Sequence, residues 1–131
     1  MKGKHILVVD EEEKLLNMID FLLVKNGYHV STANNGRDAF VKVQLAKEKG
    51  NSVDLLITDI DMLEMDDFDL MDEIHKAGLK LKALAISNKI EARNGNDIGA
   101  KGFNSFLPKP FGPMQLVEEI KEVFQGKEQK I

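Results

Sequence analysis

The sequence contains no cysteine, which excludes disulfide bonds, thiolate catalysis and cysteine-based zinc sites. It also lacks an apolar run long enough to span a membrane, and the apolar stretch after residues 1–4 is too short for a secretory signal. Basic side chains are not in excess, since 18 of them against 22 acidic ones give a net charge of −4. This balance argues against a nucleic-acid-binding surface. We therefore expect a cytoplasmic protein that binds neither a membrane nor, directly, a nucleic acid.

The remaining composition is that of an ordinary globular domain. The length of 131 residues, with 43% hydrophobic and 31% charged residues, suits one compact unit. The chain shows no internal repeat, no low-complexity segment and no linker. We expect one domain over residues 1–131 with its core over residues 4–125.

Short apolar runs alternate with amphipathic segments along the chain. The runs predict strands at residues 6–9, 28–33, 53–59, 81–87 and 103–107. Helical stripes lie around residues 15–23, before Gly27, and 39–46, ending near Gly50, then at residues 70–77, 89–100 and 113–124. The helix at residues 89–100 is the weakest, because Gly95 and two asparagines cost it about 1–2 kcal/mol of helix propensity. Five strands alternating with five helices predict an α/β fold with a doubly wound parallel sheet.

The run from Val53 to Asp59 is the centre of this pattern. It is apolar, of strand length, and ends on a carboxylate. Such a run is typical of a strand covered on both faces, as in the middle of a parallel sheet. Ligands of these sheets bind outside the carboxyl ends of the strands, where Asp59 would stand.

Five polar residues fall at or just after predicted strand ends and should converge on one edge of the sheet: Asp10, Glu11, Asp59, Ser87 and Lys109. Three carboxylates at ~4 Å would repel one another by several kcal/mol per pair at an effective dielectric near 20, so they need a cation. An acidic site of oxygen ligands suits Mg²⁺. A lysine and a hydroxyl beside it would favour a phosphoryl group, with Asp59 as the nucleophile.

These residues and their order resemble the receiver domain of two-component response regulators over Ile6 to Phe124. The stretches that carry the resemblance are residues 6–11 (ILVVDE), 56–59 (LITD) followed by Met62, 85–87 (AIS), 99–103 (GAKGF) and 107–111 (LPKPF). The resemblance implies a flavodoxin-like fold with five helices around five strands in the order 2-1-3-4-5.

The resemblance also implies the role of each site residue. Asp59 would be the phosphoacceptor, taking a phosphoryl group from a sensor histidine kinase, a phosphotransfer protein or a small donor such as acetyl phosphate. Asp10, Glu11, Asp59 and the backbone carbonyl of Asp61 would bind Mg²⁺ or Mn²⁺. Ser87 and Lys109 would contact the phosphoryl oxygens. Such a domain is a signalling switch with self-phosphorylation and autodephosphorylation, not a classical enzyme.

Further features follow from the same resemblance. Phe106 would be the switch aromatic that turns inward with Ser87, and the Lys109–Pro110 peptide would be cis. An output partner or a second copy would bind the face made by the helix at residues 89–100, the strand at 103–107 and the last helix. Two residues depart from the family pattern, because Leu63 replaces a usual proline and Asp67 a usual glycine.

Alternative interpretations remain for the strand-end residues. The fold could serve a phosphorylation-independent interaction module, or a metal-dependent phosphatase with an aspartyl nucleophile and Asp61 as its second acid. An EF-hand is excluded, because Leu63, Glu64 and Leu70 stand at loop positions five, six and twelve. We expect His5, His29 and His75 to be surface or edge residues. The charged residues of the last helix should form a solvated face: Glu118, Glu119, Lys121 and Glu122. Asp61 and Lys89 are expected to flank the mouth of the site.

Overall fold

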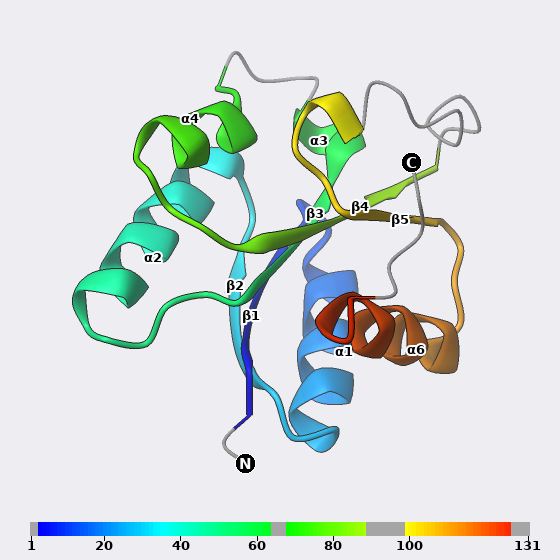
Figure 1. Cartoon of the computed structure of the whole chain (residues 1–131). Helices are drawn as coiled ribbons and strands as arrows, with labels where there is room; N and C mark the ends of the chain where they lie inside the picture. The colour runs from blue at the N-terminus through cyan, green and yellow to red at the C-terminus, as the bar shows by residue number, and fades with distance from the viewer. Residues whose placement is uncertain (1–2, 64–67, 89–98, 127–131) are drawn as a thin grey trace.

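The computed structural model describes residues 3–63, 68–88 and 99–126 (Figure 1). Five strands form one sheet: β1 (His5–Val9), β2 (His29–Ala33), β3 (Leu55–Asp59), β4 (Lys82–Ser87) and β5 (Ser105–Pro108). The helices of the described residues are α1 (Glu13–Lys25), α2 (Gly36–Glu48), α3 (Ile60–Leu63), α4 (Leu70–Lys76) and α6 (Pro113–Phe124). The strands are parallel and lie in the order β2-β1-β3-β4-β5, which confirms the predicted fold class and strand order.

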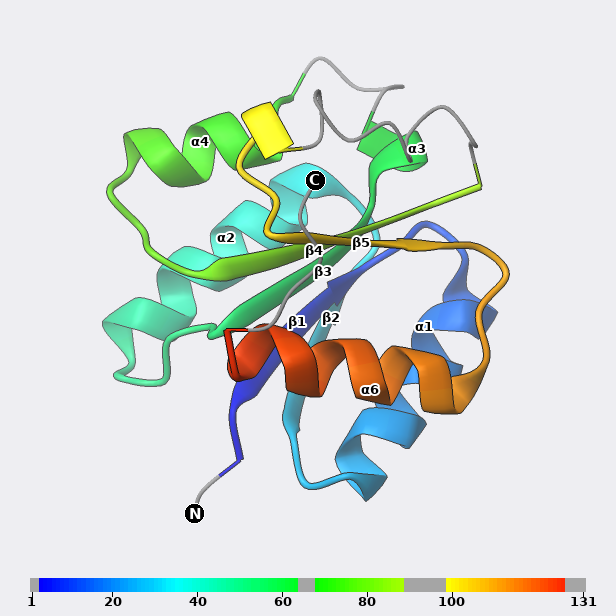
Figure 2. The ribbon, with the colours of Figure 1, turned by 45° about the vertical axis from the view of Figure 1, so that its right-hand side comes forward.

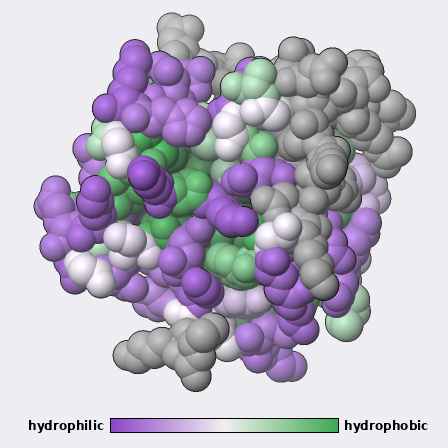
Figure 3. Space-filling view, viewed as in Figure 1, coloured by the Kyte–Doolittle hydropathy of each residue, from purple (hydrophilic) through white to green (hydrophobic). Residues whose placement is uncertain are grey.

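Helices cover both faces of the sheet, as Figure 2 shows, with α1 and α6 on one side and α2 and α4 on the other. Alternate strand residues point to opposite faces, so each strand feeds two cores. Ile6, Val8 and Ile57 pack with α1 and α6, whereas Leu7 and Leu56 pack with α2 and α4. In Figure 3 the hydrophobic residues that show on the surface gather between α2, α4 and the sheet.

Burial on both faces explains why the central strands read as continuous apolar runs. All five residues of β1 and of β3 are buried. Ile6, Leu7, Leu56 and Ile57 have no exposed surface, and burying one such side chain is worth about 1.5–3 kcal/mol. These strands form the rigid platform whose ends carry the polar residues.

Element boundaries agree with the sequence prediction to within a few residues, and the last helix spans the predicted residues 113–124. Gly27 closes α1 with a φ of 89°, a conformation that glycine adopts without steric cost. The short helix α3 directly after β3 was not expected. Four of the five predicted helices are present among the described residues, as α1, α2, α4 and α6. Most of the fifth, expected at residues 89–100, lies outside the described residues.

Two surface assignments were wrong. His5 is buried, because its ring nitrogens lie 2.8 Å from the Asn51 carbonyl oxygen and 2.8 Å from the Ser31 hydroxyl, so its polar atoms need no water. Glu119 is also buried, where its carboxylate accepts a hydrogen bond from Ser105.

Candidate functional site

The parallel pairing of β1 and β3 places two aspartates side by side. Val9 is in register with Thr58, so the residue after each, Asp10 and Asp59, leaves the sheet at the same edge. Both carboxylates are nearly enclosed, with Asp10 1% and Asp59 6% exposed. Two acids this deeply buried need hydrogen bonds and a positive partner.

Backbone amides orient the two carboxylates. The Glu12 amide donates to Oδ1 of Asp10 at 2.9 Å, and the Asp61 amide donates to Oδ1 of Asp59 at 2.8 Å. In each case the amide belongs to the second residue after the aspartate, which is the local turn expected of Asp at a strand end. The second oxygen of each aspartate, Oδ2, is therefore available to a partner that lies between the two side chains.

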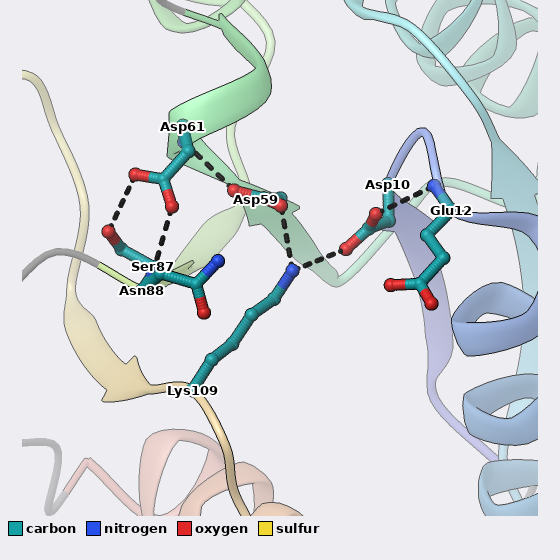
Figure 4. Close-up of polar contacts among 7 residues, drawn as sticks. All are labelled: Asp10, Glu12, Asp59, Asp61, Ser87, Asn88 and Lys109. Carbon is teal, nitrogen blue, oxygen red and sulfur yellow. Dashed lines mark hydrogen bonds and ion pairs between the residues drawn. The ribbon is translucent and has the colours of Figure 1, made fainter.

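Lys109 supplies the positive partner, from the turn after β5. Its Nζ lies 2.7 Å from Oδ2 of Asp59 and 3.0 Å from Oδ2 of Asp10, as Figure 4 shows. Burial alone would lower the pKa of Lys109, but its hydrogen bonds and charge interactions with Asp59 and Asp10 outweigh that effect and raise the pKa above its usual value. The ammonium is therefore charged at neutral pH and neutralises part of the acidic pair.

The chain around Lys109 fixes its position at the end of the sheet. The Lys109 amide donates to the Ser87 carbonyl oxygen at 2.8 Å, which extends the pairing of β4 with β5 beyond Pro108. The Lys109–Pro110 peptide is cis, as the sequence resemblance implied. Lys109 thus leaves β5 tied to the end of β4.

Ser87 and Asp61 form a second polar group at the same edge. The Ser87 hydroxyl donates to Oδ1 of Asp61 at 2.7 Å, and the backbone N–H of Asn88 donates to Oδ2 of Asp61 at 2.9 Å. The sequence indicated a role for the Asp61 carbonyl and a place for its side chain near the site mouth, but it did not reveal this pair of bonds. Asp61 lies two residues after Asp59, and Ser87 ends the neighbouring strand. This closeness was the feature of the sequence that could have indicated a contact between Asp61 and Ser87.

The structure keeps Glu11 apart from the buried pair. Glu11 is exposed, and in the described part of the chain no group of three acidic or histidine side chains is gathered as a metal site. The donor chemistry still fits Mg²⁺, which takes one or two carboxylates together with waters and phosphate oxygens. Asp10 and Asp59 are two buried carboxylates that already share one cation, and Glu11 directly follows Asp10.

The predicted switch aromatic and loop residues are placed as follows. Phe106 is 3% exposed and packs in the core on the side of α2 and α4, paired with Ala85 of β4. Leu63 ends α3. Asp67 and Lys89 lie outside the described residues, so the expectation that Asp61 and Lys89 flank the mouth of the site stays a prediction.

Comparison with known proteins points to one family. The sequence model of the response regulator receiver domain matches residues 6–121. The alkaline phosphatase synthesis transcriptional regulatory protein PhoP of Bacillus subtilis is 27% identical over 129 residues, which cover 96% of this chain and 50% of PhoP. The response regulator SaeR of Staphylococcus aureus is 25% identical over 88% of this chain and 48% of its own. The chain thus spans about half the length of these curated relatives.

Solved structures give the same result at the level of the fold. The chemotaxis response regulator CheY4 of Vibrio cholerae matches with a TM-score of 0.76 and 26% identity, over 92% of this chain and 98% of CheY4. A response regulator receiver domain from Clostridium thermocellum matches with a TM-score of 0.75 and 27% identity, over 95% of this chain and 96% of its own.

In the part of the chain that the structure describes, no helix has the length and apolar character needed to cross a membrane.

Proposed function

Because the chain belongs to the response regulator receiver domain family, we propose that it is a phosphorylation-controlled switch of a two-component or phosphorelay system, with Asp59 as the phosphoacceptor. The observation that carries the proposal is the buried contact of Asp59 with Lys109, beside Asp10. Residues 4–125 form the core of one receiver domain in this proposal. The donor is a sensor histidine kinase or a phosphotransfer protein, and the setting is the cytoplasm.

The transfer reaction follows from the carboxylate and its neighbours. A carboxylate oxygen of Asp59 attacks the phosphorus of a phosphohistidine, an O–P bond forms, the N–P bond breaks, and the imidazole nitrogen leaves with the bonding electrons. Acetyl phosphate reacts in the same way with acetate as the leaving group. Lys109 contributes positive charge that stabilises the phosphoryl oxygens while they transfer.

The residues that would hold Mg²⁺, or Mn²⁺ in its place, are Asp10, Glu11, Asp59 and the backbone carbonyl of Asp61. When bound, the ion neutralises phosphoryl charge that one lysine cannot balance. The support for this assignment is the chemistry of the two buried carboxylates, and Glu11 would turn toward them from its exposed position.

Phosphorylation converts the Asp59 carboxylate, of charge −1, into an acyl phosphate of charge about −2, so it adds about one negative charge and three acceptor oxygens to the edge of the sheet. The Ser87 hydroxyl donates to one of them, and Phe106 is the switch aromatic that turns inward as Ser87 is drawn toward the phosphoryl group. The surface around β5 and α6 then changes, and an output partner or a second copy of the chain binds there. Because the chain itself carries the phosphoryl group and does not turn over an external substrate, the domain acts as a switch and not as a classical enzyme.

The direct test is incubation with acetyl phosphate and Mg²⁺ followed by intact mass measurement. We expect the wild type to gain the mass of one phosphoryl group and Asp59→Asn to gain none. Asp20→Asn is the matched control, because it removes an aspartate from α1, away from the strand ends. It should be phosphorylated like the wild type.

Three results would contradict the proposal. A wild type that gains no mass would favour the alternative, a phosphorylation-independent interaction module on a receiver fold. Phosphorylation that persists in Asp59→Asn would place the acceptor elsewhere. Sustained turnover of a phosphoester substrate would instead indicate the metal-dependent phosphatase.

A further inference from the structure

We propose that the Asp61 carboxylate is a positioning residue that holds Ser87 in the unphosphorylated arrangement and competes with the phosphoryl group for its hydroxyl. This inference rests on the proposed function of Asp59 and deepens it. Its basis is the pair of bonds that Asp61 accepts, from the Ser87 hydroxyl at 2.7 Å and from the Asn88 amide at 2.9 Å.

The two bonds attach Asp61 to consecutive residues at the end of β4. Because one carboxylate oxygen binds a side chain and the other binds the backbone, both the Ser87 rotamer and the path of the chain are fixed. Figure 4 shows the Asp61 carboxylate directed at Ser87 and Asn88, whereas the Asp59 carboxylate is directed at Lys109. The acid that would accept phosphate and the acid that binds Ser87 therefore face different partners.

Asp61 is itself held at its backbone. Its amide donates to Oδ1 of Asp59 at 2.8 Å, so the phosphoacceptor and the residue that binds Ser87 are directly connected. A change at Asp59 would reach Asp61 through this bond as well as through space. Charge-assisted hydrogen bonds such as those that Asp61 accepts are the stronger kind.

Competition follows from the chemistry of a serine hydroxyl, which has one proton and donates one hydrogen bond at a time. If the hydroxyl turns to a phosphoryl oxygen on Asp59, its bond to Asp61 is lost. The phosphoryl group, which raises the negative charge at Asp59 from −1 to about −2, also repels the Asp61 carboxylate. The free energy gained when Ser87 binds the phosphoryl group is thus offset by the loss of its bond to Asp61. Asp61 therefore determines how far phosphorylation shifts the equilibrium toward the switched arrangement.

The first test uses the metal-free, unphosphorylated protein. Amide hydrogen exchange of Asn88, followed by ¹⁵N NMR, reports on the bond to Asp61 without any loading of Asp59. In Asp61→Ala we expect the Asn88 amide to exchange faster by on the order of tenfold. In Glu12→Gln, which removes one acid from the same edge but no bond to β4, we expect the wild-type rate. Equal Asn88 exchange in wild type and Asp61→Ala would overturn the inference.

The second test measures the competition itself. Beryllofluoride, a non-covalent phosphoryl mimic, is titrated with Mg²⁺ into wild type, Asp61→Ala, Ser87→Ala and the double variant, and occupancy is read from NMR shifts. Asp61→Ala should reach half-saturation at a concentration lower by on the order of tenfold. In the Ser87→Ala background, removing Asp61 should change half-saturation much less, because the contested hydroxyl is gone.

The outcomes separate this inference from the proposed function. If the wild type binds beryllofluoride and Asp61→Ala shows the same half-saturation, the competition is wrong while Asp59 remains the acceptor. An effect of Asp61→Ala that is equally large without Ser87 would reduce Asp61 to a general repulsive charge and would also overturn the inference. If the wild type neither binds the mimic nor is phosphorylated, the proposed function fails and the competition fails with it.

Discussion

Lys109 Nζ contacts Oδ2 of Asp59 at 2.7 Å across 50 residues of sequence, and this contact joins the edge strand β5 to the central strand β3. The same nitrogen binds Asp10 at the end of β1. One ammonium thus links three strands at the point where two buried carboxylates meet. Because both oxygens touch one nitrogen, they lie within about 6 Å of each other, a separation at which their repulsion is several kcal/mol at an effective dielectric near 20 without a cation.

Replacing Lys109 by methionine should therefore destabilise the metal-free protein. Lys109→Met keeps most of the apolar side chain and leaves two buried acids without their counterion. We expect the free energy of unfolding, measured by urea titration with EDTA, to fall by about 2–3 kcal/mol. Added Mg²⁺ should restore part of the loss, since a second cation can serve the same acids.

Lys76→Met is the matched control for this experiment. Lys76 also pairs with an aspartate, Asp72, at 3.0 Å, but both side chains are exposed on α4. Exposed pairs of this kind contribute little to stability. A Lys109→Met protein as stable in EDTA as the Lys76→Met protein would show that the buried acids do not depend on Lys109.

Strand topology explains which parts of the site were predictable. Asp59 ends β3, and Asp10 and Lys109 directly follow β1 and β5. In a parallel sheet these strand ends share one edge, so the convergence of the three residues could be predicted without side-chain detail. Glu11 was less certain, because an acid just before a helix has its own local reason to be there, and the structure leaves it exposed. The bonds of the Asp61 carboxylate to Ser87 and Asn88 were not predicted, because Asp61 lies in the short helix α3, which the sequence did not indicate.

The burial of Glu119 had a signal that was overlooked. Leu116, Glu119, Ile120 and Val123 have the spacing i, i+3, i+4, i+7 of the buried face of a helix, and all four are buried. The charge at position 119 suggested solvent, whereas helical spacing predicted the core. His5 is the same case on a strand, since it continues the buried run of β1 and finds polar partners there.

Thr58, the residue before Asp59, provides a test of buried polarity in the central strand. Its side chain has no exposed surface, and its Oγ1 has no hydrogen-bond partner among the described residues. Thr58→Val replaces the unsatisfied hydroxyl by a methyl group of similar size. We expect the free energy of unfolding in urea to rise by about 1 kcal/mol.

Thr32→Val serves as the comparison, because Thr32 lies half-buried on the edge strand β2. It should change stability by less than about 0.5 kcal/mol. A Thr58→Val protein that is less stable than the wild type would indicate that the hydroxyl has a partner, such as an internal water.

The bond between Ser105 and Glu119 should couple β5 to α6. Both side chains are buried, and the hydroxyl donates to Oε2 of the carboxylate. Ser105→Ala removes the donor and leaves a buried acid, so we expect a loss of about 1–3 kcal/mol in the free energy of unfolding. Glu119→Gln should cost less, because the amide oxygen still accepts the bond.

A double-mutant cycle of Ser105→Ala with Glu119→Leu isolates this contact. We expect a coupling energy of about 0.5–3 kcal/mol, as for residues in one buried polar pair. The control is a second cycle that combines Ser105→Ala with Glu118→Leu. Glu118 is an exposed neighbour on the same helix, so this cycle should show almost no coupling. Equal coupling in the two cycles would mean that the Ser105 contact contributes nothing specific.

Tyr28 makes the stability of the fold depend on pH in the alkaline range. It is the one tyrosine of the sequence, it precedes β2, and its ring lies 6.0 Å from that of Phe124. Partial burial disfavours the phenolate and raises the pKa of Tyr28 above 10.0. Since the unfolded chain ionises first, the contribution to folding is complete below pH 10.0 and is lost as the pH rises through the higher folded pKa.

The absorbance of the phenolate measures that folded pKa directly, because no other tyrosine and no tryptophan contribute. We expect the native midpoint to lie above that of the urea-unfolded protein. Tyr28→Phe should lose stability less steeply than the wild type above pH 10.0, while lysines that titrate in the same range affect both proteins equally. Identical midpoints for native and unfolded Tyr28 would show that the ring is as accessible in the fold as in the open chain, and its packing against Phe124 would then need another explanation.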